Sequence, residues 1–333
     1  MKLSLYAGET RDLERCLAAI VDAERRGLHA AWLPGGLALD TLTVLAVAAG
    51  RTERIRLGAG IAYAWPRHPI VLAQQALTVA AASGGRFELG IGTGHRGMLE
   101  QTFGLTWDAP TSRMLEYGGI LRDLLEHGRA SLDGRHYRVE AALWLTERPP
   151  VPIVVGALGE RMCAAAGQFA DAIMTWLAPA CYLDSVVLPA ARRGAEQAGR
   201  PQPRIVAAIP AALTSDRPAA LAGLNATFGM MSRARSYVAM LERAGLARPA
   251  DAGGWTEQML DTVVAWGDER ALETRVRQLA DAGADEVVLW PFPAGADPAA
   301  SLTATVDTMQ RLAARRPAGP ARPRETTTEG AHR

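Results

Sequence analysis

The sequence is short of the features that mark several classes of protein. It has three cysteines in 333 residues, Cys16, Cys163 and Cys181, and no two of them form a C-x-x-C pair. This spacing argues against a disulfide framework and against a structural zinc site. No apolar run is long enough to span a bilayer, and the first residues are too interrupted for a signal peptide. These absences predict a protein of the reducing cytoplasm with no membrane partner and no metal.

An excess of charge of one sign is also lacking. The chain has 36 Lys and Arg residues against 35 Asp and Glu, for a formal net charge of +1. Such a balance predicts neither a nucleic-acid partner nor a membrane surface. Hydrophobic residues make up 49% of the chain, which is enough to bury a core. The length suits one large α/β domain or two ordinary domains.

The sequence does contain short apolar runs, each followed by a segment of helical periodicity, repeated about eight times. This alternation favours a parallel sheet, and eight such units fit a (β/α)8, or TIM, barrel. The expected strands are 2–7, 30–33, 55–61, 86–91, 151–155, 172–175, 204–212 and 286–290. The expected helices are 11–26, 40–50, 68–82, 113–126, 160–169, 182–198, 269–282 and 299–314.

Two segments interrupt this rhythm. Residues 214–267 are too many for a loop between a strand and a helix, and 230–244 and 256–265 have helical character, so we expect a helical insertion before the last βα unit. From residue 316 onward the chain is rich in Pro, Arg, Thr and Glu, which predicts a disordered tail. The expected organisation is one barrel domain, 1–315, followed by the tail 316–333.

A glycine-rich motif, Gly92-Thr93-Gly94-His95-Arg96-Gly97, follows the fourth expected strand and matches G-x-G-x-x-G. A Rossmann dinucleotide fold is one interpretation. The acid about 20 residues further on, Glu116, falls within an expected helix and not at a strand end, which favours the barrel. In either fold, Gly92 and Gly94 would let a ligand or another backbone approach closely.

A second glycine turn, residues 156–162, joins the fifth strand to its helix. Free amides and the helix dipole at such a start can bind an anion, and Arg161 adds a positive charge. The alternative is an ordinary turn without a ligand. His95 lies just past a strand end, where barrel enzymes carry reactive groups and where an imidazole can donate a proton; otherwise it is a packed or surface histidine. Trp32, Trp65, Trp176 and Trp290 lie near strand ends and could enclose a flat ring.

Several stretches resemble the luciferase-like monooxygenase superfamily in its F420-dependent oxidoreductase branch. They are Thr52–Gly58, Arg67–Pro69 with Leu72–Thr78, Gly85–Gly92, Ala157–Met162 and Ala170–Ala172. The resemblance covers most of residues 1–312, and an insertion at 214–267 is typical of that superfamily.

The resemblance implies a cofactor site with F420, or alternatively FMN, across the barrel mouth. Gly60-Ile61 matches a bulge, often a non-prolyl cis peptide, that supports the cofactor ring. His95 matches a position where some members carry an acid near the reactive carbon, so it is the implied catalytic residue. The implied cofactor-binding residues are Gly60, Ile61, Gly92, Gly94, Gly156, Ala157, Gly159, Glu160, Arg161, Met162 and Trp176, with Gly159–Met162 holding the phosphate.

The chain also departs from the superfamily's pattern. Members that act on sugar phosphates carry Asp-His after the second strand, where this chain has Leu33-Pro34-Gly35-Gly36. The phosphate turn usually has Pro where Glu160 stands. Three hypotheses follow: reduction of a C=C or C=N bond in a small metabolite or peptide by reduced F420, an FMN-dependent monooxygenase, or a non-catalytic barrel that binds a cofactor or a partner protein. The resemblance further implies a homodimer.

Overall fold

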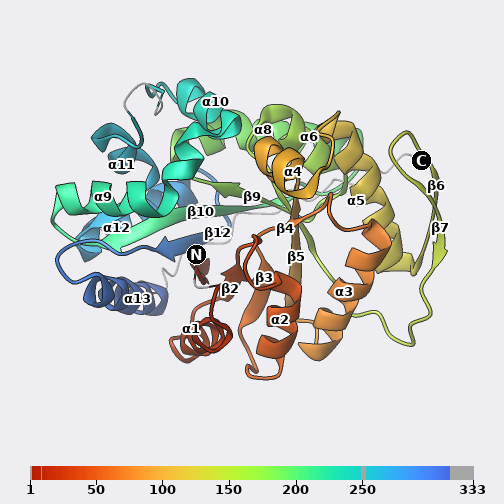
Figure 1. Cartoon of the computed structure of the whole chain (residues 1–333), viewed down its shortest axis with the longest axis horizontal. Coiled ribbons are helices and arrows are strands. Elements are labelled where there is room, and N and C mark those ends of the chain that lie inside the picture. Colours follow the sequence, from red (N-terminus) through yellow and green to blue (C-terminus); the bar gives the residue numbers. More distant parts are fainter. Residues whose placement is uncertain (1, 9, 249–252, 316–333) are drawn as a thin grey trace, which may run out of the picture.

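The computed structural model describes residues 2–8, 10–248 and 253–315. Its eight main strands run parallel and pair with their neighbours in chain order, and the last pairs with the first, which closes a barrel (Figure 1). The expected TIM barrel is therefore confirmed, and the Rossmann alternative is wrong. The strands are β1 (Lys2–Tyr6), β2 (Ala30–Leu33), β3 (Arg56–Ala59), β5 (Phe87–Gly92), β8 (Ile153–Gly156), β9 (Ala172–Trp176), β10 (Arg204–Leu213) and β12 (Glu286–Pro291).

Helices cover the outside of the barrel, and local signals set where they begin. Asp40 accepts the amide of Thr43 at 3.0 Å, and His68 stands before Pro69 and accepts the amide of Ile70 at 3.3 Å. Such caps satisfy amides that have no partner within the helix. The outer helices are α1 (Leu13–Arg25), α2 (Thr41–Ala49), α3 (Pro69–Ala82), α5 (Pro110–His127), α6 (Glu160–Phe169), α8 (Leu188–Gln197), α12 (Glu269–Asp281) and α13 (Pro298–Ala314).

Two apolar layers stabilise the barrel. Side chains that alternate along the strands point either to the barrel interior or to the helices. The interior layer contains Tyr6, Trp32, Met174 and Val288 among smaller residues, and the larger outer layer lies between the strands and the helices. Trp32 is 1% exposed, and its indole donates to Glu286 at the start of β12. Trp32 is therefore enclosed in the barrel interior with its indole nitrogen toward the floor, and it offers no exposed surface to a ring at the mouth.

Smaller elements lie in the loops between the main strands and helices. They are β4 (Ala62–Tyr63), α4 (Arg96–Phe103), the hairpin β6 (Arg129–Asp133) and β7 (Arg138–Ala142), α7 (Ala180–Tyr182) and the π-helical turn η1 (Leu183–Val187). The hairpin turns after Asp133, where the amide of Gly134 donates to the carbonyl of Tyr137 at 2.9 Å. Glu116 accepts the backbone amides of Arg135, His136 and Tyr137 and so ties the hairpin to α5. This acid therefore has a structural role.

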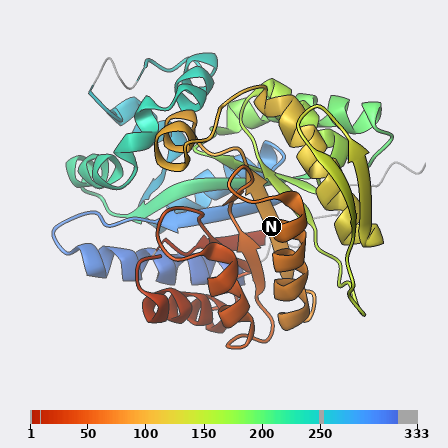
Figure 2. The same cartoon turned by 45° about the vertical axis from the view of Figure 1, so that its right-hand side comes forward.

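The insertion expected at 214–267 follows β10 and contains α9 (Arg217–Phe228), the 3-10 turn η2 (Gly229–Arg233), α10 (Arg235–Arg243), α11 (Glu257–Val263) and β11 (Ala265–Gly267). It lies on one side of the barrel in both views (Figures 1 and 2). The helix expected at 230–244 was placed too early, because Ala234 has an extended backbone (ψ 128°) that separates η2 from α10. Helix α9 was not expected.

Among the described residues, no helix is both long and apolar enough to cross a membrane. The tail expected to be disordered, 316–333, lies outside the described residues.

Candidate active site

The carboxyl ends of β3, β5 and β8 meet around Ile61. The Gly60–Ile61 peptide is cis, as the resemblance implied. A Cβ atom on Gly92 would lie 2.5 Å from Ile61 Cδ1, and one on Gly156 would lie 3.2 Å from Ile61 Cγ2. Both glycines therefore leave room for the Ile61 side chain. The structure brings together four of the residues expected to bind a cofactor: Gly60, Ile61, Gly92 and Gly156.

A glycine is also required where the second strand leaves the barrel. A Cβ atom on Gly35 would lie 2.1 Å from the carbonyl oxygen of Ile61. The carbonyl of Gly35 accepts the hydroxyl of Tyr63 at 3.3 Å. Close packing on the Ile61 backbone therefore explains why a glycine stands at position 35.

His95 lies at the start of α4, directly after the motif that ends β5. Gly94 turns the chain with φ +70°, a conformation that favours glycine. The His95 side chain is half-buried, does not cap its helix, and makes no hydrogen bond within the described part of the chain. Burial lowers the pKa of His95. An imidazole in this state is free to exchange a proton with a ligand.

Aromatic rings border the barrel mouth beside this site. Tyr6, at the end of β1, stacks on Trp290 with the ring centres 4.5 Å apart. Trp176, at the end of β9, packs 5.2 Å from Trp290 and 5.7 Å from Tyr6. Leu177 follows Trp176 with φ 59°, which is unfavourable for a branched side chain and marks a sharp turn at this strand end. Trp176 and Trp290 thus lie where the sequence placed them.

Trp65 was also expected near the mouth, and the structure corrects this. It is 6% exposed and packs against Tyr117 and the guanidinium of Arg113, which lie on α5. It therefore contributes to the helix layer. An aromatic residue just past a strand end can turn either way, and sequence alone does not decide which.

Helix α6 begins with unsatisfied amides. Gly159 precedes it and has no side chain to cap it. Its carbonyl accepts the amides of Met162 and Cys163, but within the described residues the amides of Gly159, Glu160 and Arg161 donate to no protein group. Gly159 is exposed, and a Cβ atom there would meet nothing within 4 Å. The helix start is therefore open to an anion.

Arginines gather at this helix start. Glu160 pairs with Arg193 of α8 at 2.6 Å and with Arg243 of α10 at 3.3 Å, and Arg161 is exposed. Glu160 therefore points toward the two guanidinium groups. The sequence identified Glu160 and Arg161 but missed Arg193 and Arg243, which reach the site from other elements.

Tyr237 is a second residue that the sequence did not identify. It lies on α10, is 7% exposed, and its ring centre is 5.7 Å from that of His95. Tyr237 and Arg243 are separated by six positions, or about 9 Å along a helix. Helix α10 therefore links the surroundings of His95 to the start of α6. No local pattern in the sequence indicates such a contact, because it depends on how the insertion folds back.

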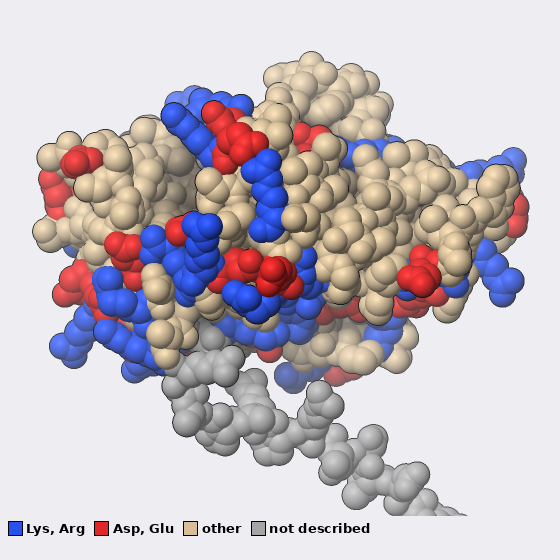
Figure 3. Space-filling model, turned by 90° about the horizontal axis from the view of Figure 1, so that it is seen from below, with Lys and Arg blue, Asp and Glu red and all other residues tan. Residues whose placement is uncertain are grey.

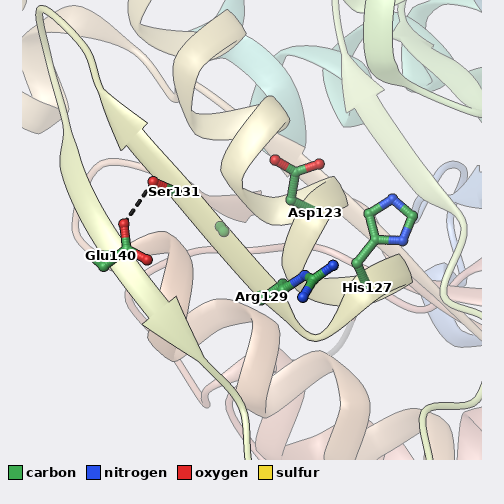
Figure 4. A pocket seen from close by; sticks show the side chains of 6 residues that line it. Asp123, His127, Arg129, Ser131 and Glu140 are labelled. Atoms are coloured by element: carbon green, nitrogen blue, oxygen red, sulfur yellow. Dashed lines mark hydrogen bonds between the residues drawn. The ribbon is translucent and has the colours of Figure 1, made fainter.

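Two surface hollows lie elsewhere. One, of about 460 Å³, is formed by the end of α5 and the β6–β7 hairpin and contains Asp123, His127 and Glu140 (Figure 4). Helix α5 runs back along the barrel, so its end lies at the opposite pole from the strand ends described above. The other, of about 650 Å³, lies between α11 and α12. In the described ranges, no three His, Cys, Asp or Glu residues gather as metal ligands.

Comparisons with known proteins agree with this geometry. A family model described as luciferase-like monooxygenase matches residues 2–286. An F420-dependent glucose-6-phosphate dehydrogenase of Nakamurella multipartita is 36% identical over 174 residues, and the match covers 50% of each chain. A 5,10-methylenetetrahydromethanopterin reductase of Methanolobus tindarius is 27% identical over 80% of this chain and 86% of that enzyme. The chain thus spans only about half the length of the first of these relatives.

Solved structures share the fold. An F420-dependent secondary alcohol dehydrogenase, in complex with an F420–acetone adduct, superposes with a TM-score of 0.79 at 17% identity, over 95% of this chain and 99% of that one. The F420-dependent tetrahydromethanopterin reductase of Methanopyrus kandleri gives 0.78 at 22% identity, over 94% and 97%. Because the family model covers most of the chain, the protein belongs to the luciferase-like monooxygenase family.

Proposed function

We propose that this protein is an F420-dependent oxidoreductase that reduces a C=C or C=N bond of a small metabolite or peptide intermediate, in natural-product biosynthesis. Relatives and structural neighbours whose names include F420 support the cofactor. The observation that carries the proposal is the open start of α6, with its free amides and nearby arginines, on the same barrel face as His95.

The described residues fit such a cofactor. The exposed turn at Gly159 leaves space for a phosphate, and Arg193 and Arg243 lie beside it. Ala157 and Met162 complete the turn, and Tyr6 and Trp176 border the place for a flat ring. When bound, F420 would supply the hydride.

The chain's own residues supply the rest of the chemistry. His95 would hold a proton at an imidazole nitrogen and pass it to the product. The aromatic rings of Tyr6, Trp176 and Trp290 would exclude water from the mouth and keep the donor and the acceptor in contact. The backbone around Gly60 and Ile61 would support one face of the ring.

The substrate of the proposed reaction is not a sugar phosphate. From the end of β2 the chain reads Leu33-Pro34-Gly35-Gly36, with no acid or histidine, and Gly35 packs against the Ile61 carbonyl. The proposed substrate therefore differs from the glucose 6-phosphate in the name of the Nakamurella multipartita relative.

A binding titration tests the cofactor. We expect F420 at micromolar concentration to quench the tryptophan fluorescence, and FMN to have a weaker effect. Trp176→Phe should lose most of this change, whereas Trp144→Phe should keep it, because Trp144 is 97% exposed. Preference for FMN would favour a flavin monooxygenase, and binding of neither would favour a non-catalytic barrel; both results contradict the proposal.

We further propose a homodimer formed through α2 and α3. Neither helix contains a charged residue, and Val47 and Val71 are exposed. Viewed from the side of α1, α2 and α3, charges of both signs cluster to the left, and a broad uncharged area lies right of centre (Figure 3). Val47→Lys together with Val71→Lys should give monomers by light scattering; an unchanged molar mass contradicts this interface. A cytoplasmic location also stays a prediction.

A further inference from the structure

Within the part of the chain that the structure describes, two tyrosine hydroxyls at the barrel mouth have no hydrogen-bond partner. Tyr6 and Tyr237 are 6% and 7% exposed, and within the described residues neither hydroxyl makes a hydrogen bond. Neither oxygen is among the fully enclosed unpaired atoms, so each retains contact with open space. Each side chain is therefore more than nine-tenths buried, while its hydroxyl oxygen keeps some accessible surface.

The other four tyrosines of the chain behave differently. The hydroxyls of Tyr63, Tyr117 and Tyr182 donate to backbone carbonyls, at 3.3, 3.1 and 3.0 Å, and Tyr137 accepts from Arg113 at 3.2 Å. Buried polar groups are nearly always paired, and exceptions often mark a functional role. Both unpaired tyrosines lie at the mouth, which singles out this place in the molecule.

The two hydroxyls lie beside the expected ring site, one on β1 and the other on α10. The Tyr6 oxygen lies 3.1 Å from where a Cβ atom on Gly60 would be, and its ring is held by Trp290. Tyr237 comes from α10 and lies beside His95. Burial raises the pKa of Tyr6, and the phenols of Tyr237 and Tyr63 raise it further. Burial raises the pKa of Tyr237 as well, so both phenols are neutral donors at neutral pH.

Contacts before and after Tyr237 in the sequence hold helix α10 in place. Arg243 pairs with Glu160 of α6, and the indole of Trp176 donates to the sulfur of Met231, which precedes the helix. These contacts position Tyr237 over the mouth. The insertion therefore contributes the hydroxyl of Tyr237 to the site.

We propose that Tyr6 and Tyr237 form a pair of hydrogen-bond donors that bind a conjugated carbonyl oxygen of the ligand in the barrel mouth. This inference rests on the proposed function. The carbonyl belongs either to the pyrimidinedione ring of the cofactor or to the second substrate. Tyr237 makes the insertion a determinant of what the mouth accepts.

The variants Tyr6→Phe and Tyr237→Phe test the pair, with Tyr117→Phe as the control. Each removes one hydroxyl, but only Tyr117 loses a hydrogen bond within the protein. Without ligand, we expect Tyr117→Phe to lower Tm and the two mouth variants to leave it unchanged or raised, because an unpaired buried hydroxyl costs stability. A fall in Tm in both mouth variants would overturn the proposal, whether or not the wild type binds a cofactor.

Binding distinguishes the two sources of the carbonyl. If the cofactor supplies it, each mouth variant should raise the Kd of F420 about fivefold, or about 1 kcal/mol. If the substrate supplies it, the Kd of F420 stays constant, and the KM for cyclohex-2-enone as a probe rises by a similar factor. An effect no larger than that of Tyr117→Phe in both assays contradicts the pair. Failure of the wild type to bind F420 would instead refute the proposed function, and the Tm comparison would then decide on the pair.

Discussion

Replacing Glu160 by Gln should strengthen cofactor binding. In this structure the Glu160 carboxylate lies at the start of α6, where the open amides would receive the cofactor's phosphate, and it pairs with Arg193 and Arg243. Glutamine keeps the shape and can still accept a hydrogen bond from either arginine. It removes a negative charge next to the expected anion. The positive charges of both guanidinium groups are then no longer neutralised by a carboxylate at position 160.

The size of the effect follows from electrostatics. Two unit charges about 6 Å apart interact by about 0.7 kcal/mol in water and by about 3 kcal/mol at an effective dielectric constant of about 20. The Glu160 side chain is 45% exposed, so solvent screening favours the lower part of this range. A gain of about 1 kcal/mol corresponds to a Kd about fivefold lower.

Fluorescence titration with F420 at low and high salt measures this change. The gain should shrink at about 1 M salt, where charges are screened within about 3 Å. Glu14→Gln is the matched control. Glu14 lies on α1, far from α6 in sequence, and its exposed carboxylate pairs with Arg51 at 2.7 Å. Its replacement should leave the Kd of F420 unchanged. Equal or weaker F420 binding by Glu160→Gln would refute an anion site at this helix.

Three further predictions concern catalysis and stability. His95→Ala should lower turnover about a hundredfold or more and leave the Kd of F420 nearly unchanged. Because burial lowers the pKa of His95, the turnover of the wild type should rise as pH falls. The variant should lose this pH dependence. A Kd that rises as much as turnover falls would make His95 structural. Gly90→Ala would place a Cβ atom 1.9 Å from the Ala59 carbonyl and should cost about 3 kcal/mol in urea unfolding, unlike Gly97→Ala, which meets nothing within 4 Å; equal stabilities would contradict this. Burial lowers the pKa of His29 from 6.5 to about 4, so its contribution to stability is complete above about pH 6.5 and lost toward pH 4; His29→Gln should flatten this decline, and an unchanged profile would contradict it.

Much of the fold could be predicted because its signals are local. Asp40 and the pair His68-Pro69 mark the starts of the helices expected at 40–50 and 68–82, and in the structure both side chains accept an amide of the first turn. The third strand is shorter than predicted, since β3 ends at Ala59, just before the cis peptide. Helix α9 was missed although Asp216 caps it and Pro218 stands in its first turn, a recognisable start signal.

The site was less accessible to sequence reasoning. The glycines around Ile61 could be identified because each lies at a strand end, and strand ends of a parallel barrel meet at one pole. Tyr237, Arg193 and Arg243 could not, because they reach the site through the packing of α8 and α10. Trp65 was misplaced for a similar reason: its burial against α5 depends on which way the loop after β4 turns.

A crystal structure of the protein with F420 would show directly whether the cofactor occupies the barrel mouth. We expect density for the phosphate at the amides of Gly159, Glu160 and Arg161, and the deazaflavin ring between Ile61 and His95. A phosphate bound at another helix start, or a ring outside the barrel mouth, would contradict this expectation.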